Sequence, residues 1–280
     1  MPEHALLEKS TRVESLDGAS IAASYQLTRY RNVLVFIHGL ACSQSFWRGQ
    51  IEGFRATHDL IVLDLAGHGE SGVGERDWTI ENFAQDVIAV LDQLNVTRAS
   101  LIGHSMGGAV ALEALNNNRQ RCRRVIGVDT VTYQEIYPRA DDAYVAAMSE
   151  ALQGNFGDTL RAALDAYFLP GGDPQVKSWV LDEMLKTSPV VGIKSMQALL
   201  RWDLDAALKK LPEAPVCINS AELLDAAVAS RYRDHLQVIP FAGGGHFLML
   251  DAPQRFNRVL YECLSDIAAT DAQVVSTDPH

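Results

Sequence analysis

The chain has 280 residues, of which 48% are hydrophobic and 21% are charged, and its formal net charge is -11. This apolar content is enough to bury one large core, or a core with a sizeable insertion, which excludes a disordered chain. An acidic chain has no electrostatic attraction to phosphate backbones, so we expect no nucleic-acid partner. No run approaches the roughly 18 to 20 consecutive apolar residues that cross a bilayer, and the N-terminal sequence lacks a basic region followed by an apolar one. We therefore expect a cytoplasmic protein without a membrane span.

The four cysteines are widely scattered along the chain. They are Cys42, Cys122, Cys217 and Cys263. Because they form no CxxC pair and have no neighbouring histidine at metal-ligand spacing, we expect free thiols, no metal site and no cofactor. Cys42 lies close to a loop that is argued below to face the active site. We expect no nucleophilic role for it, since no base is evidently placed beside it.

Short apolar or β-branched runs alternate with longer amphipathic stretches, which is typical of βα units around a parallel sheet. An N-terminal hairpin is expected to turn at Asp17-Gly18. The runs predicted to be the following strands are residues 33–37, 60–63, 100–102, 125–128, 216–218 and 236–241. Between them, apolar residues recur at helical spacing, which predicts a helix with one face on the sheet. These residues are Phe83, Val87, Leu91 and Leu94.

A long stretch between residues 132 and 211 separates two strands that a short connection would normally join. It is rich in Ala, Leu, Asp and Met, and it predicts a helical cap over the carboxyl edge of the sheet. Its helices are expected around residues 143–152, 158–168, 175–185 and 193–208. We therefore divide the chain into a first core part (1–132), a cap (133–211), a second core part (212–270) and a frayed tail (271–280).

Ser105 lies in the run Gly103-His104-Ser105-Met106-Gly107-Gly108, between a predicted strand and a predicted helix at 109–115. A G-x-S-x-G run in this context is typical of a nucleophile elbow, a tight turn that raises the serine Oγ above the sheet. Glycines are needed around such a turn, because side chains would collide with the adjoining strand or helix. Ser105 is therefore the predicted nucleophile.

A serine hydroxyl is a poor nucleophile until a base removes its proton. His246 is the best placed of the eight histidines, because it follows the last predicted strand in Gly243-Gly244-Gly245-His246-Phe247. The glycines would let this loop fold back and bring the imidazole over the elbow. His104 is expected to pack beside the elbow.

The oxyanion formed by attack on a carbonyl needs two preorganised N–H donors. Met106 would supply one of them at the amino end of the helix after the nucleophile, where the helix dipole adds to the effect. Leu40 would supply the other, in the His38-Gly39-Leu40 turn that ends the strand at residues 33–37.

A carboxylate must hold the imidazole in the right tautomer and stabilise it when it is charged. Two places on such a sheet could provide it. Asp129 ends the strand at 125–128 and is our preferred acid, although an aspartate at a strand end can also be structural. Glu222, in the loop after the strand at 216–218, is the alternative acid, and Asp225 ranks behind both.

Taken together, these motifs resemble those of the α/β-hydrolase superfamily over nearly the whole chain. The matching motifs are His38-Gly39-Leu40, Asp64-x-x-Gly67-x-Gly69-x-Ser71, the elbow and Gly245-His246-Phe247. The resemblance implies an α/β fold with a mostly parallel eight-stranded sheet flanked by helices and a helical cap inserted after the sixth strand. It also implies a Ser-His-acid triad without metal or organic cofactor. Serine at position 105 departs from the dehalogenase and epoxide hydrolase branches, which attack through a carboxylate.

Members of the superfamily usually carry the acid after the seventh strand, where this chain has Ala221-Glu222. An acid after the sixth strand, and the ending His246-Phe247-x-x-x-Asp251-x-Pro253, resemble the cofactor-free 2,4-dioxygenases of the superfamily. Those enzymes use the His-acid pair as a base to deprotonate substrate, while serine assists. The elbow with Met106-Gly107 looks more like that of an ordinary esterase.

The residues favour a serine hydrolase that cleaves a carboxylic ester, lactone or thioester of a small to medium hydrophobic substrate. Trp47 and Phe247 are candidates for the substrate pocket. Two alternatives stay open: a cofactor-independent ring-cleaving dioxygenase or C–C bond hydrolase, and a non-catalytic small-molecule receptor. The expected partner is a small-molecule substrate, and a homodimer is compatible with the sequence.

Overall fold

A computed structural model describes residues 6–28, 32–131, 133, 136, 137 and 139–275 of the chain. These residues form one eight-stranded sheet in the order β1-β2-β4-β3-β5-β6-β7-β8. The strands are β1 (Lys9–Glu14), β2 (Ser20–Gln26), β3 (Val33–Ile37), β4 (Asp59–Leu63), β5 (Ala99–His104), β6 (Cys122–Val128), β7 (Val216–Ser220) and β8 (Gln237–Phe241). β1 pairs antiparallel with β2 and β2 antiparallel with β4, whereas the pairs from β4 to β8 are parallel. The predicted fold class is confirmed.

The N-terminal hairpin turns where the sequence predicts. Gly18 lies in the turn with a φ of 77°, a conformation that costs glycine little because it has no Cβ. β3 and β4 are buried at every residue. Strands covered on both faces need apolar side chains on both, which is why these runs do not alternate between polar and apolar residues.

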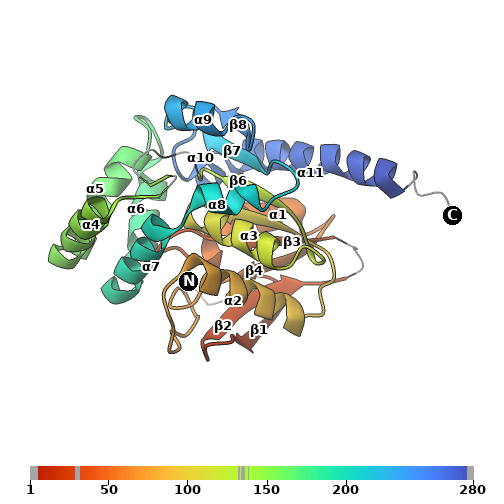
Figure 1. Cartoon of the computed structure of the whole chain (residues 1–280), viewed down its shortest axis with the longest axis horizontal. Coiled ribbons are helices and arrows are strands. Elements are labelled where there is room, and N and C mark those ends of the chain that lie inside the picture. The colour runs from red at the N-terminus through yellow and green to blue at the C-terminus, as the bar shows by residue number, and fades with distance from the viewer. Residues whose placement is uncertain (1–5, 29–31, 132, 134–135, 138, 276–280) are drawn as a thin grey trace.

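Helices cover both faces of the sheet (Figure 1). Those that do not belong to the four-helix cap described below are η1 (Gln44–Trp47), α1 (Arg48–Phe54), α2 (Ile80–Gln93), α3 (Met106–Asn117), α8 (Leu204–Lys209), α9 (Ala226–Tyr232), α10 (Leu248–Asp251) and α11 (Pro253–Val275). α3 contacts α2, α8, β5 and β6, while α1 contacts α10 and α11. Thr79 caps α2 by accepting the N–H of Asn82, which fixes where that helix begins.

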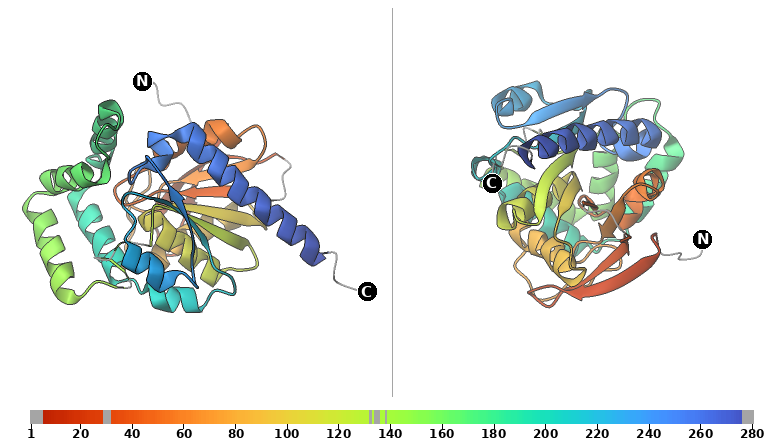
Figure 2. Two further views of the ribbon diagram at one scale, coloured as in Figure 1. Left: turned by 90° about the horizontal axis from the view of Figure 1, so that it is seen from above. Right: turned by 90° about the vertical axis from the view of Figure 1, so that its right-hand side faces the viewer.

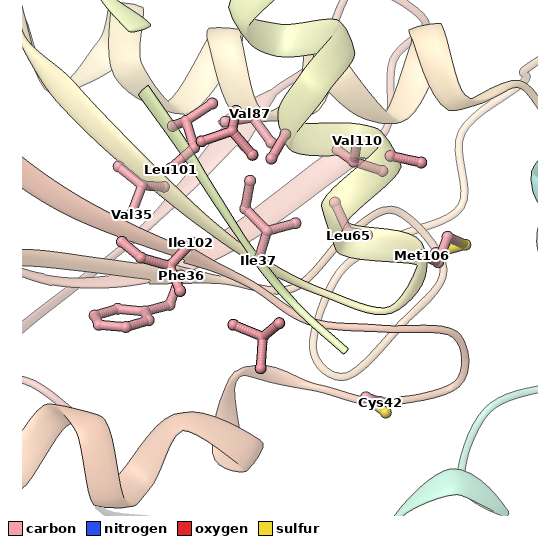
Figure 3. Close-up of a cluster of buried hydrophobic side chains, with 14 of the residues drawn as sticks. Val35, Phe36, Ile37, Cys42, Leu65, Val87, Leu101, Ile102, Met106 and Val110 are labelled. Carbon is pink, nitrogen blue, oxygen red and sulfur yellow. The ribbon is translucent and has the colours of Figure 1, made fainter. Parts of the chain in front are cut away.

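The apolar core lies on both sides of the central strands (Figure 3). Val35 pairs in register with Leu101, and Phe36 with Ile102, so successive side chains of β3 and β5 point to opposite faces together. The ring of Phe36 packs against Trp47, with centroids 5.1 Å apart. This packing makes the central strands a rigid support for the loops at their carboxyl ends.

Between β6 and β7 the described residues form α8, which lies against α3, and four further helices, which stand apart from the sheet and are called the cap below (Figures 1 and 2). They are α4 (Asp142–Gly154), α5 (Phe156–Tyr167), α6 (Pro174–Met184) and α7 (Pro189–Arg201). The single helix expected at 193–208 is wrong, because α7 ends at Arg201 and α8 begins at Leu204. Asp203 between them caps α8 by accepting the N–H of Ala206. The buried Trp202 donates its Nε1–H to Glu113 of α3 at 3.0 Å, which ties this break to the core.

At the other end of the chain, the frayed tail expected at 271–280 is wrong for its first five residues, because α11 continues to Val275. The remaining residues, 276–280, lie outside the described part of the chain. None of the helices described here combines the length and the apolar character needed to cross a membrane.

Candidate active site

Ser105 occupies the single position between β5 and α3. Its φ of 51° and ψ of -120° form a strained turn that non-glycine residues rarely adopt. The strain is held by close packing: a Cβ on Gly103 would lie 2.2 Å from the carbonyl oxygen of Gly107, and a Cβ on Gly107 would lie 2.4 Å from that of Ile37. The structure therefore places Ser105 on a sharp elbow at the carboxyl edge of the sheet.

The expected oxyanion donors lie on two sides of this elbow. Met106 is the first residue of α3, so its N–H has no acceptor within the helix. Leu40 lies in the turn after β3, where the N–H of Cys42 binds the carbonyl of Gly39 at 3.2 Å. A Cβ on Gly39 would lie 3.1 Å from the Cβ of Ser105, which brings this turn directly against the elbow.

His38 fixes the orientation of that turn. Leu65 donates its N–H to His38 Nε2 at 2.9 Å, so Nε2 carries no proton and Nδ1–H donates to the carbonyl of Gly39 at 2.7 Å. Burial lowers the pKa of His38 to about 4, which keeps the imidazole neutral as this pattern requires. Because the peptide is planar and trans, a Gly39 carbonyl held by His38 turns the N–H of Leu40 to the opposite side.

Asp129 and His246 meet across the site although 117 residues separate them. The distance between His246 Nδ1 and Asp129 Oδ2 is 2.6 Å, and both side chains are buried. Asp129 follows β6 with a φ of 45°, and its Oδ1 accepts the N–H of Ser220 at 2.8 Å. These contacts aim the carboxylate at one nitrogen of the imidazole.

The other two carboxylates considered from the sequence are engaged elsewhere. Glu222 is exposed, and its Oε1 accepts the N–H of Gly243 at 2.7 Å. Asp225 caps α9 by accepting the N–H groups of Ala227 and Val228. The structure thus brings Asp129 to His246, and not the alternative acid Glu222.

Tyr133 is a site residue that the sequence reasoning missed. Its hydroxyl donates to Asp129 Oδ2 and lies 2.9 Å from His246 Nδ1. Burial, followed by the nearby charge of Asp129, raises the pKa of Tyr133 well above its usual value, so the hydroxyl stays a donor. No motif marks this position, and its only sequence signal is that it follows the acid by four residues.

Two aromatic rings from the core and the cap flank the imidazole of His246. His104 lies on the core side with ring centroids 4.7 Å apart, and it contacts the His246 carbonyl through Nε2 at 2.9 Å. Burial lowers the pKa of His104 well below its usual value, so this ring is neutral and donates through Nε2–H. Tyr167, the last residue of α5, lies on the cap side with ring centroids 4.5 Å apart.

The two pocket candidates have different positions. Phe247 stacks on Phe168 of the cap at 5.6 Å and contacts His104 at 5.1 Å, so it borders the site. Trp47 is fully buried and packs against Phe36, and its place in the substrate pocket stays a prediction.

All four cysteines are buried free thiols, as expected from the sequence. Burial raises the pKa of Cys42, which disfavours the thiolate that a nucleophile would need. Among the residues that the structure describes, no group of three His, Cys, Asp or Glu side chains is arranged to hold a metal ion.

Comparison with known proteins agrees with this geometry. The model of the alpha/beta hydrolase family matches residues 34–259. The chain belongs to this family. It is 27% identical over 237 residues to the dihydrolipoyllysine-residue acetyltransferase component of an acetoin cleaving system from Pseudomonas putida, with 80% of this chain and 61% of that protein covered. The chain therefore spans less than two thirds of the length of that relative.

Two further proteins match this chain over most of its length and most of their own. The proposed carbamate hydrolase RutD of Caulobacter segnis is 24% identical over 249 residues, with 84% of this chain and 91% of that protein covered. An esterase from Exiguobacterium antarcticum superposes with a TM-score of 0.79 at 20% identity, covering 91% of this chain and 99% of the esterase. The likeness to the esterase structure shows the shared fold.

Proposed function

We propose that this family member is a serine hydrolase that cleaves carboxylic esters through an acyl-enzyme. The observation that carries the proposal is the 2.6 Å hydrogen bond between His246 Nδ1 and Asp129 Oδ2, next to a serine held at a φ of 51°. With Nδ1 bound to the carboxylate, Nε2 is the nitrogen left to receive a proton from Ser105.

In this mechanism Ser105 Oγ attacks the acyl carbonyl while His246 takes its proton. Asp129 keeps His246 in the Nδ1–H tautomer and stabilises the imidazolium that forms. The N–H groups of Leu40 and Met106 bind the oxyanion of the tetrahedral intermediate. His246 then protonates the leaving alcohol, and the acyl group stays on Ser105 as an ester. Water, deprotonated by His246, attacks this ester and releases the carboxylic acid and the free serine.

The apolar surroundings of His246 favour a small to medium hydrophobic acyl or alcohol group, including lactones and thioesters. Phe247 and Phe168 stack next to the base and are the residues best placed to border such a group. The names of the related proteins support acyl chemistry of this kind, since one is an esterase and another a proposed carbamate hydrolase.

Covalent labelling tests the proposal. A fluorophosphonate should add to Ser105 in the wild type, identified by mass spectrometry of the labelled peptide, and Ser105→Ala should lose both label and turnover of p-nitrophenyl esters. The exposed cap residue Ser178 offers a matched control, because Ser178→Ala should change neither. An unlabelled Ser105 in a folded protein, with no hydrolysis across acetyl to octanoyl esters and lactones, would exclude the serine hydrolase.

A second candidate is a cofactor-free ring-cleaving dioxygenase or a C–C bond hydrolase. It is favoured by the position of the acid, because Asp129 follows β6 and not β7. In that chemistry His246 and Asp129 would deprotonate the substrate, and Ser105 would only assist. Uptake of dioxygen with a hydroxyquinolone, persisting in Ser105→Ala, would identify the oxygenase and contradict the hydrolase. Ligand binding without turnover would instead indicate a receptor.

A further inference from the structure

The cap helix α5 ends directly on the loop that carries His246. Tyr167 is the last residue of the helix, and its carbonyl accepts the N–H of His246 at 2.9 Å. The last carbonyls of a helix have no partner within the helix, so an outside donor satisfies one of them here. The contact is close enough to require glycine next to it, because a Cβ on Gly245 would lie 2.2 Å from the Tyr167 oxygen.

Side chains extend the same contact. The ring of Tyr167 lies 4.5 Å from the imidazole of His246, and the ring of Phe168 stacks on Phe247 at 5.6 Å with an interplanar angle of 23°. Two successive residues of the cap thus contact two successive residues of the histidine loop. The rings of His104, Tyr133 and Phe247 also contact the imidazole, so the cap supplies one of the rings around it.

The direction of α5 matters as well as its position. The carboxyl end of a helix carries a partial negative charge, which stabilises a nearby cation by about 0.3–1 kcal/mol, and by more in partly buried geometries. His246 becomes positively charged when it takes the proton of the nucleophile. The end of α5 therefore lies where it stabilises the charge that develops during the reaction.

From these contacts we propose that the end of α5 is a positioning element for the catalytic base. Tyr167 holds His246 through its carbonyl and its ring, and the helix end stabilises the imidazolium. The cap then acts on catalysis itself and not only on substrate choice. The catalytic part of this inference rests on the proposed function, whereas the hydrogen bond to His246 does not.

The pH profile is informative because few ionisable groups surround the imidazole. Those that face His246 are Asp129, Tyr133, His104, Tyr167 and Asp251. The acidic residue in the last turn of α5, Asp165, is exposed and pairs with Lys177 at 2.5 Å. In a variant whose α5 end is displaced from His246, the imidazolium loses this stabilisation. The acid limb of the kcat/KM profile of that variant should therefore move to lower pH by about half a unit.

Gly245→Ala tests the anchor, because its Cβ forces the Tyr167 carbonyl away from the loop. We expect the amide of His246 to exchange with deuterium at least about tenfold faster, measured on the full chain by mass spectrometry of the peptides that contain it. We also expect kcat to fall by about 10- to 100-fold with little change in KM, as a small displacement of a catalytic group produces. Gly157→Ala, at the opposite end of α5 with its nearest neighbour 3.4 Å away, should change neither.

A panel of acyl chain lengths separates positioning from specificity. A positioning role predicts the same factor of loss for acetyl and octanoyl esters. Tyr167→Leu removes the ring and should lower kcat by a smaller factor that is the same for all esters. Tyr167→Phe keeps the ring and should not show this loss. A loss confined to long acyl chains, or an unchanged exchange rate of the His246 amide in Gly245→Ala, would overturn the proposal. If the wild type hydrolyses no ester, the proposed function fails, and the exchange measurement still decides whether α5 holds His246.

Discussion

The elbow that carries Ser105 and the loop that carries His246 are held in different ways. Ser105 is fixed through its backbone, since Gly103, Gly107 and β3 pack closely around it, its N–H donates to the carbonyl of Val128 and its carbonyl accepts from Thr130. His246 is fixed from outside its own segment, by Asp129 after β6, Tyr133 beyond it and Tyr167 of the cap.

The difference indicates how each region should respond to change. A substitution of an elbow glycine acts on the backbone of a buried turn, so its effect is on folding. A substitution around His246 removes one of several contacts and leaves the loop in place, so its effect is on proton transfer. We expect glycine substitutions in the elbow to lower stability, and substitutions around His246 to lower catalytic activity.

Asp129→Asn should have the largest effect and sharpens the comparison most. The amide can no longer hold the Nδ1–H tautomer or stabilise the imidazolium, so kcat/KM should fall by about 10⁴, as for a triad that loses its acid. The melting temperature should change little in comparison. Steady-state kinetics with one p-nitrophenyl ester measures the loss.

Glu222→Gln is the matched control for this prediction, because Glu222 is exposed and its hydrogen bonds to described residues are those with the Gly243 N–H and, more weakly, the Ser220 hydroxyl. It should retain near-normal kcat/KM. If the two results were reversed, Glu222 would be the acid and the assignment of Asp129 would be wrong.

Gly107→Ala should cause the largest loss of stability. Its Cβ would meet the carbonyl oxygens of Ile37 and His38 at 2.4 and 2.6 Å, and these backbone atoms belong to the central strand and the oxyanion turn. We expect a loss of at least about 4 kcal/mol or no soluble protein, measured by urea unfolding. Gly154→Ala, with nothing within 4 Å of its Cβ, should be neutral or slightly stabilising. Equal effects of the two changes would break the comparison.

The same contrast explains what could be predicted from the sequence. The elbow, its strand and its helix are local in the sequence, so the glycine spacing was enough to predict Ser105, and buried apolar runs were enough for the strands. The partner of His246 depends on how distant segments meet, so Asp129 and Glu222 could not be separated. Tyr133 and Tyr167 carry no motif at all. The break at Trp202-Asp203 has a local signal, the Asp203 cap of α8, but the contact of Trp202 with Glu113 that also fixes it is tertiary and cannot be predicted from the sequence.

Low pH should lower the stability of the fold near the elbow, because two buried histidines there are neutral in the folded state. Burial lowers the pKa of His38 to about 4 and that of His68 to about 3, and their rings are 5.2 Å apart. Each is neutral in the folded state and binds a proton more readily when unfolded, so their contribution is complete above pH 6.5 and is lost as the pH falls toward these values. His38 alone should account for about 3 kcal/mol between pH 7 and pH 4.

Urea unfolding across this range measures the slope of stability against pH. His68→Gln should make the slope shallower, because glutamine does not titrate, while His235→Gln should leave it unchanged because His235 is exposed. A slope that is the same in all three proteins would show that other groups cause the acid sensitivity.

Tyr133→Phe should have the smallest effect, and it tests whether several contacts around His246 each contribute to holding the imidazole in place. The change removes the hydroxyl that donates to Asp129 Oδ2 but keeps the ring, and Asp129 and Tyr167 still hold the imidazole. We expect kcat to fall by about tenfold, the worth of one hydrogen bond to a charged group, with the melting temperature nearly unchanged. Tyr137→Phe removes a buried hydroxyl that touches neither Asp129 nor His246, and it should lower stability more than kcat. A Tyr133→Phe enzyme that lost stability and kept its kcat would place Tyr133 with the elbow, as a residue that supports the fold and not the base.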